Sequence, residues 1–190
     1  MLVLQNWQTV CSIDSGLKNF CKYILVILLA FSGFGFQQQS DPVAKSKAIF
    51  IYNFTRYFEW PENMKSGNFI IHVIGSNSNI TQELNKMAGL KQIGNQKLEI
   101  KNSGGIDMSI KPHIIYILND ASDVLKEVAS KFKGKGALIV TEKNGLCKLE
   151  SALNFVAVDN KAKFEYNKGN AISAGLKTRD ELKNLAVAVY

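Results

Sequence analysis

The stretch Phe69-Ile-Ile-His-Val-Ile74 decides the fold, because it is one of three short apolar runs rich in β-branched residues. The other two runs are His113-Ile-Ile-Tyr-Ile-Leu118 and Ala137-Leu-Ile-Val140. None of the three alternates apolar with polar residues. Continuous apolar runs of this length are typical of parallel strands that are covered on both faces. We therefore expect a central sheet with buried, parallel strands.

Helical patterns alternate with these runs, over residues 41–59, 80–90 and 121–132. The first opens with Asp41-Pro42, an N-cap followed by proline at the first helical position, and Pro61 stops it. This helix is apolar on most of its circumference, so we expect it to be buried. Strands that alternate with helices predict an α/β domain with a mostly parallel sheet.

The remaining segments complete a compact, three-layer-like domain. Residues 96–101 alternate apolar with polar, which predicts a half-exposed edge strand. Two strand-like runs, 152–158 and 161–166, are joined by Asp159-Asn160 and predict a C-terminal β-hairpin. Two terminal helices are expected after it. The first spans 168–174, and the second begins at the capping-box spacing Thr178-Arg-Asp-Glu181.

Residues 1–36 differ in composition from the rest. Lys18 and Lys22 precede the apolar run 23–31, small residues follow, and a polar stretch begins at Gln37. This order is typical of a secretory signal peptide, so residues 37–190 are expected to form an exported, periplasmic domain. About twenty residues precede the apolar run, which is long for the positively charged first region of a signal peptide. An uncleaved membrane anchor, or a start codon placed too far upstream, therefore stays open.

Charge and motifs argue against several function classes. The chain has 23 basic and 16 acidic residues, but its lysines are scattered and its only arginines are Arg56 and Arg179. We expect no nucleic-acid binding, which usually depends on clustered arginines. No hydrolase, zinc-protease, phosphate-loop or dinucleotide motif occurs. We expect no catalysis, no cofactor and no metal. His72 and His113 fall in expected strands, where a histidine is more often packed or hydrogen-bonded than catalytic.

Two stretches carry a family resemblance. They are Lys47-Ala-Ile-Phe-Ile-Tyr-Asn-Phe-Thr-Arg-Tyr-Phe-Glu-Trp-Pro61 and Leu153-Asn-Phe-Val156, the latter continued by Phe164-Glu-Tyr-Asn167. The chain resembles the YfiR-like family of periplasmic regulators over about residues 43–190. The resemblance implies an α/β sandwich in the periplasm. It also implies that the domain binds the periplasmic part of an inner-membrane signalling protein, typically a diguanylate cyclase, and holds it inactive.

The resemblance also implies that redox state or a small ligand adjusts the binding of the partner. Some relatives carry paired cysteines, whereas Cys147 is alone once the leader is removed. His113 stands where a strand-start cysteine can occur in relatives. We therefore do not expect control by an intramolecular disulfide. Cys147 remains a redox candidate through an intermolecular disulfide, and a homodimer through the aromatic helix stays open.

Two groups of residues are candidate binding sites. The partner- or ligand-binding candidates are Tyr52, Asn53, Phe54, Trp60 and Asn154. Core packing is the alternative for the aromatic residues, and a structural clamp is the alternative for Asn154. Polar residues also follow the three expected parallel strands, where α/β sheets bind ligands. The strand ends carry three pairs of polar residues: Ser76 and Asn77, Asn119 and Asp120, and Thr141 and Glu142. The pocket candidates for a small polar ligand are Ser76, Asn77, Asn119 and Thr141, although helix caps and loops use the same residue types.

Three functions follow from this reading. The first is a non-catalytic regulator that represses an inner-membrane diguanylate cyclase, with a sensor kinase as the other candidate partner. The second is a periplasmic small-ligand sensor or carrier without a protein partner. The third is a thiol enzyme built on Cys147, which would require a lowered thiol pKa.

Overall fold

A computed structural model describes residues 41–76 and 78–190, so the leader and Asn77 lie outside the described residues. Within the described residues, the main sheet has eight strands in the order β10-β8-β7-β6-β5-β2-β4-β3. Their bounds are β2 Phe69–Ile74, β3 Gln92–Ile93, β4 Gln96–Ser103, β5 Ile114–Ile117, β6 Leu138–Thr141, β7 Leu153–Val158, β8 Lys161–Tyr166 and β10 Ala188–Val189.

The centre of this sheet is parallel, as the apolar runs predict. β4, β2, β5, β6 and β7 are parallel neighbours, while β7 and β8 form an antiparallel hairpin. All four residues of β5 and of β6 are buried. The predicted edge strand over residues 96–101 lies in the half-exposed β4, and only Gln96 and Lys97 have a further neighbour, because the two-residue β3 pairs antiparallel with them. The mixed α/β fold with a mostly parallel sheet is confirmed.

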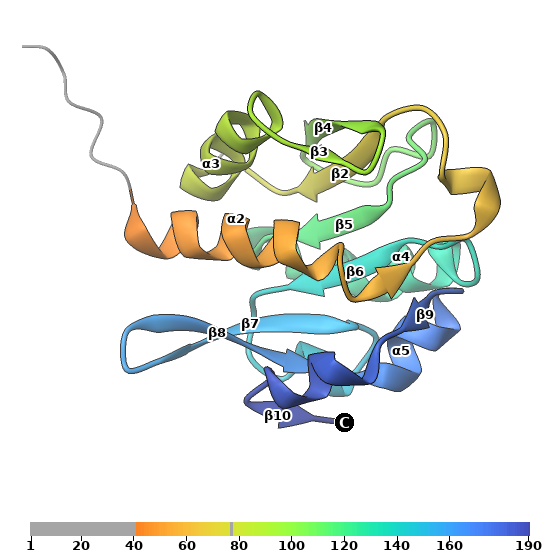
Figure 1. Cartoon of the computed structure of the whole chain (residues 1–190). Coiled ribbons are helices and arrows are strands. Elements are labelled where there is room, and N and C mark those ends of the chain that lie inside the picture. Colours follow the sequence, from red (N-terminus) through yellow and green to blue (C-terminus); the bar gives the residue numbers. More distant parts are fainter. Residues whose placement is uncertain (1–40, 77) are drawn as a thin grey trace, which may run out of the picture. The chain divides into compact units, whose positions relative to one another are not determined.

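Helices cover both faces of the sheet (Figure 1). α2 (Pro42–Phe54) and α3 (Asn79–Ala88) lie on one face, and the 3₁₀-helix η2 (Asn119–Val124) with α4 (Leu125–Phe132) lies on the other. On the second face, α4 packs against Ile115, Ile117 and Ile139. No helix of the described residues is long and apolar enough to cross a membrane.

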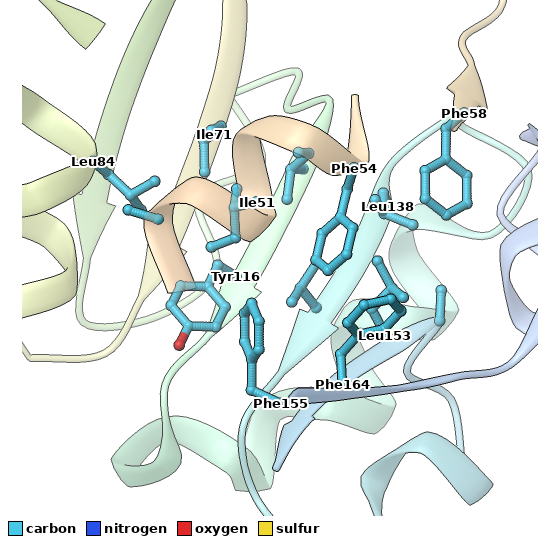
Figure 2. Close-up of a cluster of buried hydrophobic side chains, with 14 of the residues drawn as sticks. Ile51, Phe54, Phe58, Ile71, Leu84, Tyr116, Leu138, Leu153, Phe155 and Phe164 are labelled. Carbon is cyan, nitrogen blue, oxygen red and sulfur yellow. The ribbon is translucent and has the colours of Figure 1, made fainter. Parts of the chain in front are cut away.

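Aromatic side chains fill the core between α2 and the sheet (Figure 2). Phe54, at the last turn of α2, meets Phe164 edge-on with ring centroids 4.9 Å apart, and it meets Phe155 at 6.0 Å. Phe50 packs against the same two sheet residues. Edge-on and offset pairs are the favoured geometries for aromatic rings. The helix is therefore fixed on the sheet by its C-terminal half.

The expected helix over 41–59 is too long. α2 ends at Phe54, and Phe58–Glu59 instead form β1, which pairs antiparallel with β9 (Lys177–Thr178) in a separate two-stranded sheet. Phe58 and Trp60 are buried while Glu59 is exposed, which is the two-residue period of a strand. The Trp60 indole also donates to the carbonyl of His113 at 3.1 Å. These contacts require an extended backbone after the helix.

The C-terminal part follows the predictions except at its last helix. Asp159 and Asn160 have φ of 50° and 57°, as a type I′ hairpin turn requires. α5 (Lys168–Ser173) ends before Gly175, whose φ of 88° suits a C′ glycine. The expected capping box at Thr178 is wrong. Thr178 lies in β9, so only a short 3₁₀-helix, η4 (Asp180–Asn184), follows.

Two further 3₁₀-helices, η1 (Glu62–Met64) and η3 (Leu146–Lys148), complete the described elements. η1 is tied to the sheet by His113. The Nδ1 atom of His113 accepts from the Ile70 amide at 3.1 Å, and its Nε2 atom lies 2.7 Å from the Met64 carbonyl. Burial lowers the pKa of His113, so the ring is held neutral in this position. This histidine has a structural role.

Truncation of Phe54 should weaken the core severely. We expect Phe54→Ala to lower the free energy of unfolding by about 3–5 kcal/mol, because it removes a ring that is 2% exposed. Ile49→Ala is the matched control on the same helix. Ile49 is 45% exposed, so its loss should cost about 1 kcal/mol or less. Urea unfolding of both variants measures the difference, and equal midpoints would contradict the packing described.

Candidate functional site

A cavity of about 430 Å³ opens at the carboxyl ends of β2, β5 and β6. The N-terminal turns of α2 and α3 form its other walls. Five of its lining residues are Asp41, Lys47, Ser76, Asn119 and Glu142. We call it the strand-end cavity.

The chain connections make this position distinctive. The crossover from β2 to β4 runs through α3 on one face of the sheet, and the crossover from β5 to β6 runs through α4 on the other face. β2 and β5 are neighbours, so the two crossovers diverge between them. Open α/β sheets bind ligands at such a topological switch point, outside the carboxyl ends of the strands.

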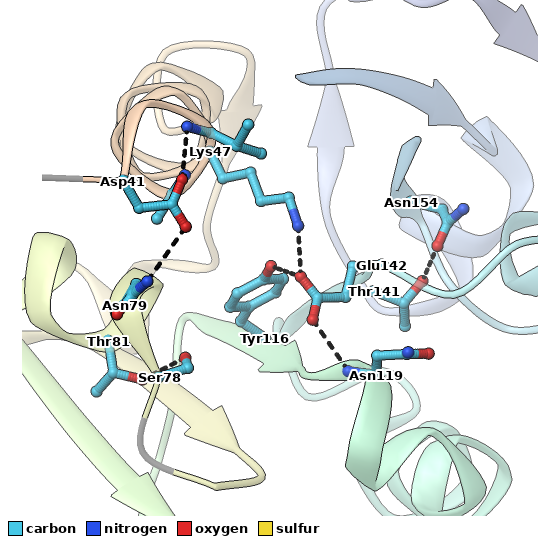
Figure 3. A network of polar contacts seen from close by, with 12 residues as sticks. Asp41, Lys47, Ser78, Asn79, Thr81, Tyr116, Asn119, Thr141, Glu142 and Asn154 are labelled. Atoms are coloured by element: carbon cyan, nitrogen blue, oxygen red, sulfur yellow. Dashed lines mark hydrogen bonds and ion pairs between the residues drawn. The ribbon is translucent and has the colours of Figure 1, made fainter. Parts of the chain in front are cut away.

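Three hydrogen bonds hold the side chain of Glu142 in the cavity (Figure 3). Its Oε2 atom accepts from Lys47 Nζ at 2.7 Å and from the hydroxyl of Tyr116. Its Oε1 atom accepts from the backbone N–H of Asn119 at 3.0 Å. Burial raises the pKa of Tyr116 well above its usual value, and the charge of Glu142 adds to this. The phenol therefore stays protonated and donates. These bonds fix the carboxylate of Glu142 in one orientation.

Two aspartates flank the same opening. Asp41 caps α2 by accepting from the amides of Val43 and Ala44, at 2.9 and 3.2 Å. Asp120 accepts from the Ser76 amide at 3.0 Å. The backbone bond from Ala44 lowers the pKa of Asp41, and hydrogen bonds from Ser76 lower that of Asp120. Both carboxylates are therefore ionised at neutral pH.

Gly75 makes the approach of Asp120 to β2 feasible. Its φ is 131°, and a Cβ atom at this position would lie 2.6 Å from Asp120 Oδ1. Only glycine provides both the backbone conformation and the space.

The structure brings together two of the four strand-end candidates. Ser76 and Asn119 line the cavity, whereas Asn77 lies outside the described residues. Thr141 does not line it, because its side chain is buried and points toward β7. The Thr141 hydroxyl lies 2.7 Å from Asn154 Oδ1. Successive side chains along a strand point to opposite sides. Glu142, the residue after Thr141, therefore lines the cavity in its place.

The partner-surface candidates are also separated by burial. Phe54 and Trp60 belong to the core, and Asn154 is fully buried. Asn154 Nδ2 donates to Glu165 Oε2 at 3.0 Å, so this amide joins β6, β7 and β8 as a clamp. We therefore no longer place these three side chains on a binding surface. Tyr52 and Asn53 are half-buried and keep part of their surface on α2.

A second hollow, of about 560 Å³, lies at the other end of α2, where β1 pairs with β9. Both arginines of the chain, Arg56 and Arg179, line it. Neither guanidinium forms an ion pair within the part of the chain that the structure describes; Arg56 lies over the Tyr52 ring at 5.9 Å. We call this the arginine hollow. Its remaining lining residues are Thr55, Phe58, Glu59, Lys177 and Thr178.

Sequence reasoning missed the arginine hollow. Arg56 and Arg179 stand 123 positions apart (179 − 56), and only the pairing of β1 with β9 brings their segments together. The available signal was the scarcity of arginine, two residues among 23 basic ones. That scarcity served only to argue against nucleic-acid binding.

Cys147 lies in the protein interior. It is fully buried, and its sulfur is 3.9 Å from the carbonyl of Ala152. Burial, with a further contribution from the charge of Glu165, raises the pKa of the thiol to about 12. Thiolates, not thiols, attack electrophiles and exchange disulfides. Neither a thiol enzyme nor an intermolecular disulfide fits Cys147 in this conformation.

The second histidine, His72, is equally unsuited to proton transfer with solvent. It is fully buried, and its Nε2 atom lies 2.6 Å from the hydroxyl of Ser103. Burial lowers its pKa. Within the described residues, no group of three or more His, Cys, Asp or Glu side chains could hold a metal ion.

Comparison with known families adds one finding. The model of the YfiR/HmsC-like family, DUF4154, matches residues 44–187. The match covers both hollows almost completely, from the first turn of α2 to the segment after η4. No curated protein matches the chain.

The thiol of Cys147 should be inert in the folded protein. We expect iodoacetamide at pH 8 to modify Cys147 at least about 100-fold more slowly in buffer than in 8 M urea, where the pKa returns to about 8.5. Mass spectrometry of the peptide that contains Cys147 separates it from Cys11 and Cys21. Equal rates under the two conditions would show that the site opens readily and would restore a redox role.

Proposed function

The chain belongs to the YfiR/HmsC-like family of periplasmic regulators, and we propose that it binds the periplasmic part of an inner-membrane signalling protein and holds it inactive. The family is regulatory rather than catalytic. In this proposal, residues 1–36 direct export and residues 37–190 form the regulatory domain. The expected partner is a diguanylate cyclase, and a sensor kinase is the other candidate.

The arginine hollow is the observation that supports a protein partner best. Arginine carries five donors in a rigid fork that binds carboxylates bidentately, and it is enriched among residues that dominate binding energies at interfaces. Arg56 and Arg179 have no carboxylate partner in the described residues, so their donors are available. An acidic segment of the partner would satisfy both.

The rest of the hollow fits the same kind of partner. Lys177 is exposed and adds positive charge, although Glu59 lies 3.7 Å from its ammonium. Thr178 also lines the hollow, and the Thr55 hydroxyl, which donates to the Tyr52 carbonyl at 2.7 Å, can accept a hydrogen bond there. The hollow therefore combines charge with directional donors around the buried ring of Phe58. This is the composition of an interface patch with an ionic rim.

The alternative function is a small-ligand sensor without a protein partner. The strand-end cavity favours it, because the cavity lies where α/β sheets bind ligands and presents several polar groups. The two functions are compatible, since the two hollows lie at opposite ends of α2.

The partner should be recovered from membranes through the arginines. We expect the tagged full-length protein to capture one inner-membrane signalling protein from solubilised envelopes. The double variant Arg56→Gln, Arg179→Gln should recover at least about tenfold less of it, because truncated arginine hot spots typically cost 2 kcal/mol or more.

Lys91→Gln is the matched control, since Lys91 is exposed and lies outside the hollow. It removes one positive charge without touching the proposed contact. Circular dichroism of each bait verifies folding. Full recovery with the double arginine variant would remove the arginine hollow from the interface, and a folded wild-type bait that captures nothing would favour the ligand sensor.

A further inference from the structure

We infer that the strand-end cavity binds a small organic cation, a primary amine whose carbon skeleton carries hydroxyl or other polar groups. The binding itself is independent of any protein partner. Its use as a signal that adjusts partner binding rests on the proposed function.

The place and size of the cavity support a ligand of a few to about a dozen heavy atoms. It occupies about 430 Å³ at the topological switch point between β2 and β5. Small-molecule sites in proteins typically begin at about 300 Å³. The walls come from α2, α3 and the loops that follow three parallel strands, so a ligand would contact segments that are far apart in the sequence.

The charges around the cavity select a cation. Asp41, Asp120 and Glu142 contribute three carboxylates, and Lys47 contributes the one ammonium group of the lining. That ammonium lies 2.7 Å from Glu142, so it is already occupied. An anionic ligand would meet two uncompensated aspartates. An ammonium group would meet acceptors whose geometry is already fixed by hydrogen bonds.

Asp120 is the aspartate best placed to hold the ammonium. Its side chain is exposed to solvent, whereas Asp41 is partly buried and is held by two amides of α2 and by Asn79 at 3.3 Å. Asp120 accepts from the Ser76 amide at 3.0 Å, and hydrogen bonds from the Ser76 side chain and from the backbone of Asp120 and Ala121 also lower its pKa. The exposed carboxylate is therefore ionised and open to an ammonium group.

Other lining groups select the remainder of the ligand. Val43, Ala44, Ile80 and Leu118 provide apolar surface against which a short carbon skeleton can pack. Ser76, Ser78 and Asn79 provide side-chain donors and acceptors at the rim. A bare inorganic cation would leave both the apolar wall and these groups unused. An amine with hydroxyl groups would use them.

A ligand at this place would act on the start of α2. Lys47 and Asp41 both belong to the first turns of the helix or to its cap, and both take part in the polar contacts around the cavity (Figure 3). A cation that shares the Glu142 carboxylate would weaken its bond to Lys47. The helix that carries both groups ends beside the arginine hollow.

The test uses isothermal titration calorimetry on the full-length protein with matched pairs of probes. Putrescine is paired with 1,4-butanediol, and glucosamine is paired with glucose; calcium chloride and succinate test inorganic cations and anions. We expect at least one amine to bind with a Kd below about 1 mM and its uncharged counterpart to bind at least about tenfold more weakly.

Asp120→Asn should weaken amine binding at least about tenfold, because it removes the charge but retains an oxygen for the Ser76 amide. Asp159→Asn is the matched control. Asp159 lies in the exposed hairpin turn, whose positive φ asparagine also tolerates. It should bind the amine as the unaltered protein does.

Five results would overturn the inference, of which the first four concern probes that bind. They are equal binding of an amine and its uncharged counterpart, tighter binding of succinate, binding of calcium without any amine, and amine binding that Asp120→Asn leaves unchanged. Absence of binding by every probe would also overturn it. Each result is independent of the membrane capture experiment, so failure of the ligand site and failure of the partner site can be told apart.

Discussion

The aromatic packing of α2 on the sheet is the contact on which the rest of the structure depends. Phe54 sits between Phe155 and Phe164 and is 2% exposed, so the last turn of the helix cannot shift without opening the core. The position of that turn places Arg56 just before β1. Because β1 pairs with β9, Arg179, which follows β9, lines the same hollow. At the other end, the same rigid helix carries Lys47 to Glu142. One buried contact thereby positions both hollows.

Buried polar groups add hydrogen bonds to this arrangement. Asn154, Thr141 and Glu165 link three strands by side-chain hydrogen bonds, as buried amides generally require. Burial raises the pKa of Cys147 and lowers the pKa of His72 and of His113, so each group is held in its uncharged form. The thiol and both imidazoles are therefore neutral and enclosed. The two hollows, in contrast, carry charged side chains, which suits recognition.

Local patterns were sufficient to predict much of the fold. The three apolar runs became β2, β5 and β6, and Asp159-Asn160 became the expected turn, because strand burial and turn conformation are encoded by neighbouring residues. The end of α2 was not predictable in this way. Phe58 and Trp60 are apolar like the helix before them, and only their pairing and burial against distant segments show a strand. For the same reason the sequence did not show which of the neighbours Thr141 and Glu142 faces the cavity, and the arginine hollow was missed.

We propose that this member of the YfiR/HmsC-like family meets a membrane partner at the end of the domain where β1 pairs with β9. Photo-crosslinking in intact cells tests it most directly, with p-benzoylphenylalanine placed at Lys177, whose side chain is 82% exposed in the arginine hollow, and at Lys91 as the control position. The account predicts an adduct between position 177 and an inner-membrane signalling protein, and no such adduct from position 91. An adduct with that membrane protein from position 91 alone would contradict it.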